Sequence, residues 1–507
     1  MKYKNPILKG FYPDPSICVV GDDYYLINST FEYLPGVPIF HSKNLINWTQ
    51  IGHCITRNSQ INLDKAPPSL GIFAPTIHYH QGIYYIITTN ILQIDKGNYY
   101  FKTNDITKEW SDPIWINIHG IDPSLLFDDD KVYVQYCTTL NGIEGIAQSE
   151  LNIETGELLT EPKIISCGSG GRCCEGPHMY KINGYYYLLT AEGGTEAGHM
   201  VTIRRSKSVW GPFDECPHNP IVTNRDKNHE LLQNVGHADL FKDHNENWWI
   251  VALAVRSIDA KDYLGRETIL LPVTWSKDNW PIVHKGYAES TIEANLPGVI
   301  EETNTSFIDD FNDDILAMRW NTIRDFSTDL YTLHDRKGYL TLFTTPNSLS
   351  DLDKISFIGC RQPDFDCEVI TKLNFIGGKN KEEAGITIFM DYEHHMDLFI
   401  SGTNDKRIVN VRKTVADVKS TTSIKIYNTE SIYLKIIGNA KEYSFYYSLD
   451  GCKYIFLDKT YTKHLSVQSA NSRFTGVYLG MYTTSNGELS TSKVQFDFFS
   501  YKNLENN

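Results

Sequence analysis

Five short aromatic runs recur along the first 300 residues, and their spacing constrains the fold more than any other feature. Most follow a turn-forming pair, such as Gly21-Asp22 or Asn183-Gly184, and a preceding β-rich run, which is typical of a β-hairpin. The central residues of the runs are 60, 48, 54 and 62 residues apart; they are Tyr25, Tyr85, Tyr133, Tyr187 and Trp249. This period predicts a five-bladed β-propeller of four-stranded blades, with an unrelated tyrosine-rich β-sandwich as the alternative.

Acidic residues also recur at one position of the repeat. Counting back 11 residues from each anchor gives Asp14, Ala74, Asp122, Gly176 and Ala238. Three carboxyl groups stand at these positions or one residue before them, those of Asp14, Asp122 and Glu175. The innermost strands of a propeller line a central channel and run in the same direction, so their equivalent ends meet at one mouth. We therefore expect the three acids to converge.

Converging acids favour a functional site over a structural one. A single Asp before Pro and Ser is usually a turn residue, but like charges at a partly desolvated mouth raise one another's pKa and are rarely kept for stability. Glycosidic cleavage needs one carboxylic acid to protonate the leaving oxygen and one carboxylate to activate water or attack the sugar. Phe31 and Phe73, near the ends of the first two blades, could stack on a sugar ring, with packing between blades as the alternative.

Composition excludes several partners and cofactors. The chain has 47 Lys and Arg against 62 Asp and Glu, a net charge of −15, and no basic run of five, which argues against nucleic acid. No apolar stretch approaches the roughly 20 residues of a membrane helix, and the start lacks the apolar core of a signal peptide. We expect a cytoplasmic protein, unless a leader has been trimmed. Its ten cysteines, with no C-x-x-C pair, predict reduced thiols and no zinc site.

A set of motifs carries a family resemblance. They are NPI at 5–7, FYPDPS at 11–16, GIDPS at 120–124, EGPH at 175–178, AEGGT at 191–195 and LGRET at 264–268. Together they resemble glycoside hydrolase family 43. The region from residue 307 is similar to the concanavalin-like β-sandwich that follows the propeller in the family's β-xylosidases. Alternating strands at 339–343, 384–389 and 476–481 also predict a sandwich. We expect an all-β chain with a catalytic propeller at 1–304 and a sandwich at 305–507.

The resemblance implies an inverting, exo-acting enzyme on hemicellulose oligosaccharides. By this analogy Asp14 is the general base, Glu175 is the general acid, and Asp122 holds Glu175 in place and raises its pKa. Because Asp122 and Glu175 belong to consecutive units, three and four, we expect them to couple electrostatically, while Asp14 in unit one stands apart. Acids on different blades can supply the gap of roughly 6.5–9.5 Å that an inverting pair needs.

Three further residues are candidates for substrate binding. The resemblance places Arg266 in the site, where its guanidinium could hold a sugar hydroxyl or orient a carboxylate; a surface salt bridge is the alternative. His237 holds the fifth blade's equivalent of the acid positions, near the channel axis, where the family often keeps a histidine beside water or calcium. We expect no required cofactor, and any calcium there to be structural. Glu192, in a glycine-rich loop, is predicted to be a hydroxyl ligand or a solvated acid.

Substrate preference remains open between two pentoses. Phe73 stands where β-xylosidases carry Trp, and GGRCCE at 170–175 and QNVGH at 233–237 look closer to branches with α-L-arabinofuranosidases. The two sugars present similar hydroxyl geometry, so one altered wall residue shifts the preference by only about 1–3 kcal/mol. We favour a β-xylosidase slightly over a predominantly α-L-arabinofuranosidase.

Two other functions are weighed against these. A retaining β-fructosidase would open with an Asn-Asp-Pro-Asn type of motif, and a non-catalytic sugar-binding propeller leaves three phased acids unexplained. The expected partner is a hemicellulose-derived oligosaccharide, with neither nucleic acid nor membrane. The sandwich is expected to buttress the propeller and help close a short pocket, and a homo-oligomer built through the folded surfaces is compatible with the sequence.

Overall fold

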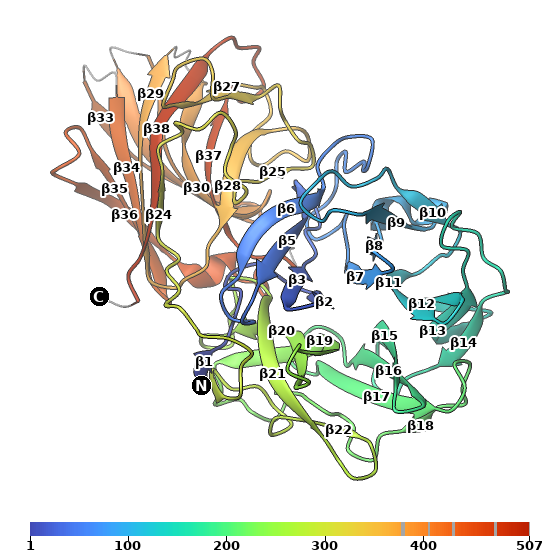
Figure 1. The fold of residues 1–507 in the computed structure, drawn as a ribbon. Coiled ribbons are helices and arrows are strands. Elements are labelled where there is room, and N and C mark those ends of the chain that lie inside the picture. The colour runs from blue at the N-terminus through green and yellow to red at the C-terminus, as the bar shows by residue number, and fades with distance from the viewer. Residues whose placement is uncertain (377–380, 404–405, 428–430, 471–473, 506–507) are drawn as a thin grey trace.

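Five four-stranded antiparallel sheets surround a common axis and form a β-propeller (Figure 1). The computed structural model describes residues 1–376, 381–403, 406–427, 431–470 and 474–505. Blade 1 consists of β2 (Ser16–Val20), β3 (Asp23–Ile27), β5 (Gly36–Ser42) and β6 (Thr49–Ile55). Blade 2 consists of β7 (Thr76–His80), β8 (Ile83–Thr88), β9 (Asn98–Thr103) and β10 (Ile114–Ile116).

The other three blades repeat this plan. Blade 3 consists of β11 (Ile121–Asp128), β12 (Lys131–Leu140), β13 (Ile143–Glu150) and β14 (Lys163–Ser166). Blade 4 consists of β15 (Glu175–Ile182), β16 (Tyr185–Glu192), β17 (Met200–Ser206) and β18 (Asp214–Glu215). Blade 5 consists of β19 (Leu232–Lys242), β20 (Trp248–Arg256), β21 (Glu267–Trp275) and β22 (Pro281–Val283). The predicted propeller is therefore confirmed.

The aromatic runs form the second strand of every blade, in β3, β8, β12, β16 and β20. Aromatic and β-branched side chains suit these strands because they pack well on a pleated surface. In β3, Tyr24 and Leu26 are fully buried, whereas Asp23 and Tyr25 are partly exposed, as the period of two requires. The ring closes at its ends: β1 (Lys2–Lys4) pairs with β23 (Thr291–Glu293), and the innermost β19 contacts β2.

A left-handed residue recurs near the start of the innermost strands. Its φ is 49° at Asp14, 55° at Asp122, 55° at Gly176 and 46° at His237. Asp, Gly and His are among the residue types that tolerate this conformation. The pairing register shifts beside it in β11, β15 and β19, and such bulges re-aim the neighbouring side chains. In four of the five blades, a residue at or next to the predicted position of the repeat therefore has a left-handed backbone conformation.

The C-terminal part is a sandwich of two antiparallel sheets (Figure 1). One sheet follows the order β28 (Ser356–Arg361), β37 (Tyr478–Thr484), β30 (Glu383–Asp391), β31 (His394–Ser401), β32 (Arg407–Val415) and β33 (Val418–Ile426). The other follows the order β26 (Tyr331–Thr332), β27 (Leu340–Phe343), β38 (Lys493–Asn503), β29 (Cys367–Ile376), β34 (Ser431–Gly438), β35 (Glu442–Ser448) and β36 (Ile455–Tyr461), with β24 (Phe307–Asp309) on β38. Aliphatic residues from both sheets, such as Ile386 and Leu434, fill the core between them.

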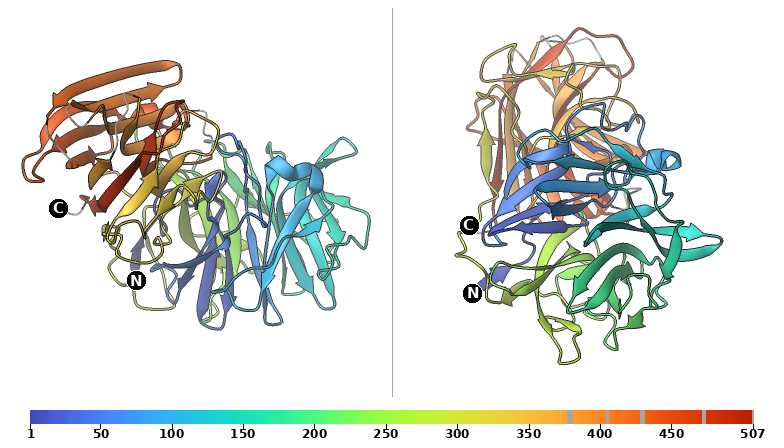
Figure 2. Two further views of the ribbon diagram at one scale, coloured as in Figure 1. Left: turned by 90° about the horizontal axis from the view of Figure 1, so that it is seen from above. Right: turned by 45° about the vertical axis from the view of Figure 1, so that its right-hand side comes forward.

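The sandwich packs against the propeller on the side of blade 1 (Figure 2). A short pair joins the two parts, β4 (Tyr33–Leu34) with β25 (Thr322–Ile323). Next to it the rings of Tyr33 and Tyr478 stack with centroids 4.0 Å apart. Arg361 donates from Nε to the carbonyl oxygen of Phe11 at 2.6 Å. This interface brings sandwich residues close to the propeller mouth.

The remaining elements are short. The described helical segments are the 3-10 turns η1 (Ile91–Lys96) and η2 (Thr462–Leu465), and within the described residues no helix has the length and apolar character to cross a membrane. All ten cysteines are free thiols, including the adjacent Cys173 and Cys174. The connection from β23 to β24 contains the predicted boundary at residues 304/305, which stays a prediction of where an independent unit begins.

Candidate active site

A pocket of about 250 Å³ opens at the mouth of the propeller. Every residue predicted for the site lines it except Glu192. The lining residues come from all five blades and from the sandwich; they are Asp14, Phe31, Phe73, Ala74, Ile121, Asp122, Arg172, Cys173, Glu175, Gly194, Thr195, Glu196, His237, Arg266 and Phe474. The volume is below the roughly 300–1,000 Å³ of pockets for drug-sized ligands and suits a ligand as small as one sugar ring.

Asp14 lies on the pocket floor and is 4% exposed. Arg266 donates from Nη1 to Asp14 Oδ1 at 3.0 Å, and the Ser29 hydroxyl donates to Asp14 Oδ2 at 2.6 Å. Burial alone would raise the pKa of Asp14, but the Arg266 guanidinium, His237 and the Ser29 hydroxyl together hold it below its usual range. Asp14 is therefore a carboxylate at neutral pH, with Arg266 orienting it.

Asp122 and Glu175, which come from the neighbouring blades 3 and 4, form a pair of carboxyl groups. The backbone N–H of Gly176 donates to Asp122 Oδ2 at 3.2 Å, which ties Asp122 to the residue after Glu175. Burial and then the neighbouring acid groups raise the pKa of Asp122 well above its usual range. Burial and the charge of Asp14 raise the pKa of Glu175 to about 7. Mutual repulsion in a dry site means that this pair keeps at least one proton near neutral pH.

The three acids thus differ in protonation although they line one pocket. Asp14 has a cationic partner and is ionised, whereas the Asp122 and Glu175 pair holds a proton. Asp14 stands apart in its partners, as the blade order predicts, yet its charge still contributes to the raised pKa of Glu175. An ionised base and a protonated acid in one site are the two groups that acid–base hydrolysis of a glycosidic bond requires.

Aromatic rings form one wall of the pocket. Phe31 stacks on Phe474 with ring centroids 5.7 Å apart and meets Phe73 edge-on at 5.5 Å. The Arg266 guanidinium lies 5.0 Å from the centre of the Phe474 ring. Phe31 and Phe73 therefore pack on each other between the blades, and because both also line the pocket, stacking on a sugar ring stays a prediction.

Phe474 was not among the residues expected from the sequence. It belongs to the sandwich and reaches the pocket just before β37. No phase or motif marks it, since the repeat ends with the propeller. Arg172, Cys173, Thr195 and Glu196 were also missed as pocket residues, although they flank the EGPH and AEGGT motifs. Proximity to those motifs is the one signal that could have found them.

His237 lies beside Asp14, with Nδ1 3.7 Å from Asp14 Oδ1. Burial lowers its pKa to about 4, so the ring is neutral near pH 7. Calcium takes six to eight oxygen ligands, but here the nearby carboxylate of Asp14 already serves Arg266 and Ser29. Among the described residues, no group of three or more His, Cys, Asp or Glu side chains is placed to hold a metal. The calcium considered from the sequence near His237 therefore stays a prediction.

Glu192, predicted as a hydroxyl ligand or a solvated acid, is neither of these in the structure. It is fully buried behind the loop that carries Arg172. Its carboxylate pairs with Arg204 at 3.0 Å and accepts from the backbone N–H groups of Ser169 and Gly171 at 2.9 Å. The glycine-rich surroundings suggested an open loop, but they allow the backbone to close around the carboxylate. Glu192 shapes one wall of the pocket from behind.

Comparisons with known proteins identify the family of both parts of the chain. The model of glycosyl hydrolases family 43 matches residues 3–281, and that of the beta xylosidase C-terminal concanavalin A-like domain matches residues 308–502. A non-reducing end α-L-arabinofuranosidase from Bacteroides ovatus is 38% identical over 99% of this chain and 95% of its own. A xylosidase/arabinosidase from Butyrivibrio fibrisolvens is 37% identical over 99% of both chains.

A solved structure extends the likeness to three dimensions. The crystal structure of a xylan β-1,4-xylosidase from Bacillus halodurans has a TM-score of 0.93 at 33% identity and covers 99% of this chain and 100% of that one. This one solved structure therefore matches both parts of the chain, the propeller and the sandwich. This chain belongs to glycosyl hydrolases family 43, and it is a glycosidase.

Proposed function

We propose that this enzyme removes single pentose residues, β-1,4-linked xylose and α-L-arabinofuranose, from the non-reducing ends of hemicellulose oligosaccharides with inversion. The observation that carries the proposal is the split protonation of three acids in one small pocket: Asp14 ionised beside Arg266, and Glu175 with a pKa of about 7 beside Asp122. The names of the relatives, xylosidase and arabinofuranosidase, supply the substrate class.

The chemistry follows from the protonation states. Asp14 removes a proton from a water molecule, which attacks the anomeric carbon of the terminal sugar. Glu175 gives its proton to the departing glycosidic oxygen on the other side. Asp122 lies beside Glu175 through the Gly176 N–H and disfavours its ionisation. Arg266 keeps Asp14 oriented and ionised, so that Asp14 can take a proton from the attacking water.

The shape of the pocket supports exo cleavage. Its volume of about 250 Å³ leaves room for little more than a terminal sugar ring. Phe474 of the sandwich also lines it and stacks on Phe31. A polymer chain would need an open groove here, whereas a chain end needs only this recess.

We place β-xylosidase activity slightly ahead of arabinofuranosidase activity, with both in the same pocket. A predominantly α-L-arabinofuranosidase is the second candidate. The Bacteroides relative favours it, as does Phe73 at a position where β-xylosidases carry Trp. The difference between the two sugars is worth only about 1–3 kcal/mol at one wall of a pocket.

The test is side-by-side turnover of nitrophenyl β-D-xylopyranoside and nitrophenyl α-L-arabinofuranoside, with the anomer of the first-formed sugar followed by NMR. We expect cleavage of both, faster with the xyloside, and an inverted product. A product with retained anomeric configuration would contradict the inverting mechanism and would favour a double displacement, as in a retaining β-fructosidase. Absence of cleavage of either sugar would contradict the proposal, and a preference for the arabinofuranoside would select the second candidate.

A further inference from the structure

Phe474 is held at the pocket by both of its backbone groups. Its N–H donates to the Ser69 hydroxyl oxygen at 3.0 Å, and its carbonyl oxygen accepts from Arg266 Nε at 3.3 Å. Both partners belong to the propeller, Ser69 to the loop between β6 of blade 1 and β7 of blade 2 and Arg266 to blade 5, whereas Phe474 belongs to the sandwich. Two polar tethers therefore fix one sandwich residue between the first and the last blade.

Ser69 is itself rigidly placed. It is 3% exposed, and its N–H donates to Glu32 Oε2 at 3.0 Å. The same loop is joined to Phe31 by two backbone hydrogen bonds with Ile72, at 2.9 and 3.1 Å. A buried hydroxyl on a loop fixed in this way can act as a reference point for Phe474, because neither it nor its support is free to move with solvent.

The second tether leads to the general base. Arg266 uses Nε for the Phe474 carbonyl and Nη1 for Asp14 Oδ1, at 3.3 and 3.0 Å. A guanidinium is planar, so a contact at Nε restricts the direction in which its Nη groups point. The position of the Phe474 carbonyl therefore helps to set how the Arg266 fork meets Asp14. Ser69, Phe474, Arg266 and Asp14 form one continuous chain of contacts across the interface.

We propose that Ser69 is a positioning residue for catalysis: through its hydroxyl it holds Phe474 of the docked sandwich so that the Phe474 carbonyl orients Arg266 against Asp14. The inference rests on the proposed function, in which Asp14 is the general base. It makes docking of the sandwich part of the catalytic apparatus, beyond closing the pocket. If ring packing alone held Phe474, the Ser69 hydroxyl would be dispensable.

Two variants isolate the hydroxyl. Ser69 has φ of 62°, a conformation that strains any residue with a Cβ, so Ser69→Gly relieves this strain and adds backbone freedom, whereas Ser69→Ala keeps the strain as it is in the wild type. Loss of the hydroxyl is the one change that they share. Lys65→Gly is the matched control, because Lys65 is exposed in the same loop and has φ of 54°. Thermal unfolding of the full-length variants checks that each one is folded.

The expected result has a signature that mere destabilisation lacks. For both Ser69 variants, kcat/KM on nitrophenyl β-D-xylopyranoside should fall about 10-fold, as expected for one buried hydrogen bond. In the pH profile of kcat/KM, the acid limb should move to higher pH by about 0.5 unit. Asp14 must be ionised to act, and a poorly held Arg266 favours its ionised form less. Lys65→Gly should change neither quantity.

Hydrogen exchange of the Phe474 amide provides a readout that needs no activity. Exchange should be faster in both Ser69 variants than in wild type and in Lys65→Gly. The inference would be overturned if both Ser69 variants had the same Phe474 amide exchange, the same kcat/KM and the same acid limb as the wild type. Faster exchange with an unmoved acid limb would also overturn it, because the tether would then not reach Asp14. A wild type that cleaves neither pentoside would instead contradict the proposed function, independently of the exchange result.

Discussion

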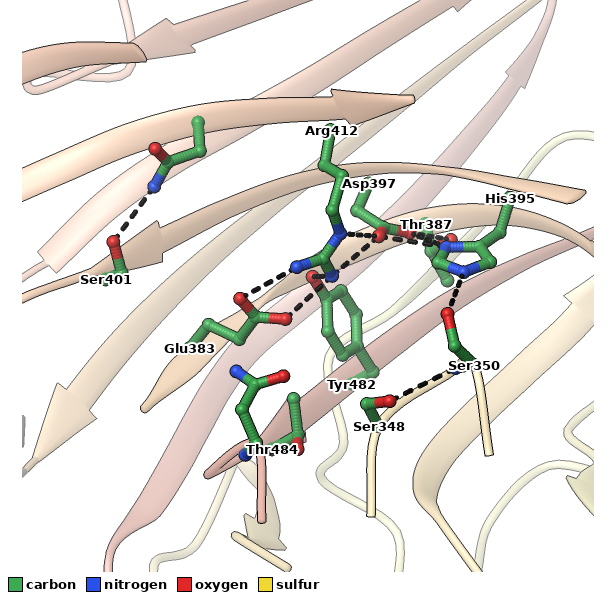
Figure 3. A network of polar contacts seen from close by, with 12 residues as sticks. Ser348, Ser350, Glu383, Thr387, His395, Asp397, Ser401, Arg412, Tyr482 and Thr484 are labelled. Atoms are coloured by element: carbon green, nitrogen blue, oxygen red, sulfur yellow. Dashed lines mark hydrogen bonds and ion pairs between the residues drawn. The ribbon is translucent and has the colours of Figure 1, made fainter. Parts of the chain in front are cut away.

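Two clusters of buried carboxyl groups invite comparison, one in the sandwich domain and one at the mouth of the propeller. In the sandwich, Asp397 and Glu383 share Arg412, which contacts them at 2.8 and 2.7 Å (Figure 3). His395 lies 2.8 Å from Asp397, and the Thr387 hydroxyl donates to the same carboxylate at 2.8 Å. Burial would raise the pKa of Asp397, but His395 and Arg412 hold it well below its usual range.

The cluster at the propeller mouth has three acids instead of two, and Asp122 and Glu175 lack a cationic partner like that of Asp14. Arg266 serves Asp14, while Asp122 has a single backbone N–H at 3.2 Å. Burial raises the pKa values of Asp122 and Glu175, to which the charge of Glu175 adds for Asp122 and the charge of Asp14 adds for Glu175. The sandwich acids do not line the pocket, whereas all three propeller acids do.

The difference separates a structural from a catalytic use of the same side chains. A buried acid whose oxygens are saturated by cations and hydroxyl groups keeps one protonation state and fixes the packing around it. An acid that is left partly unpaired at a cavity keeps a pKa near the working pH and can exchange a proton with a ligand. Substitutions should therefore affect turnover in one cluster and stability in the other.

The largest effect is expected for Asp14→Asn. The variant keeps the shape of the side chain but cannot accept a proton from water, so kcat should fall by about 10³ to 10⁴-fold on every pentoside. Steady-state kinetics with good and poor leaving groups measure this loss. An equal fall for all leaving groups identifies the base, and a loss of less than 10-fold would assign the role to another group.

Glu175→Gln should give a loss that depends on the leaving group. Turnover of xylobiose, whose leaving oxygen needs a proton, should fall by about 10² to 10⁴-fold, and turnover of nitrophenyl xyloside by much less. The alkaline limb near pH 7 should disappear, because it reports the ionisation of Glu175. Glu157→Gln, at an exposed acid between β13 and β14, is the matched control. Equal losses on both substrates would contradict the role of general acid.

Much of the fold could be predicted because it repeats. Each aromatic run is local, and five of them at one period leave few alternatives, so the blades could be assigned without any knowledge of long-range contacts. The convergence of Asp14, Asp122 and Glu175 follows from the same symmetry. The pairing of β4 with β25 obeys no period, so the docked arrangement of the sandwich could not be derived in the same way.

The residues that sequence reasoning missed or misplaced have no counterpart in the repeat. Phe474 lies far from the propeller in sequence and reaches the pocket only through the interface. Glu192 sits among glycines, which are equally compatible with an open loop and with a backbone wrapped around a buried carboxylate. Its partner Arg204 lies on β17, and its pairing with Glu192 follows from strand register rather than from any motif.

The sandwich cluster should respond to substitution with a loss of stability. Asp397→Asn removes one partner of a buried ion pair and should lower the free energy of unfolding by about 3–5 kcal/mol, with kcat nearly unchanged. Because the pKa of Asp397 is lowered by folding, its contribution is present above the unfolded value of about 3.9 and is lost as the pH falls further. The difference in the free energy of unfolding between variant and wild type should therefore become smaller below about pH 4.

Urea unfolding at pH 7 and at pH 3 measures this gap. Asp417→Asn, in the exposed turn between β32 and β33, is the matched control and should leave stability within about 0.5 kcal/mol of wild type. A fall in kcat with unchanged stability would contradict the division of the two clusters.

The smallest effect is expected where the two acids of the propeller pair are uncoupled. Asp122→Asn keeps an acceptor for the Gly176 N–H but removes the negative charge beside Glu175. The pKa of Glu175 should fall from about 7, because repulsion no longer disfavours its ionised form. A general acid acts when protonated, so the alkaline limb of kcat/KM should move about one unit toward acid, with about a 5-fold loss at pH 7. Profiles from pH 4 to 9 measure the shift; an unmoved limb would show that burial and Asp14, rather than Asp122, set the proton affinity of Glu175.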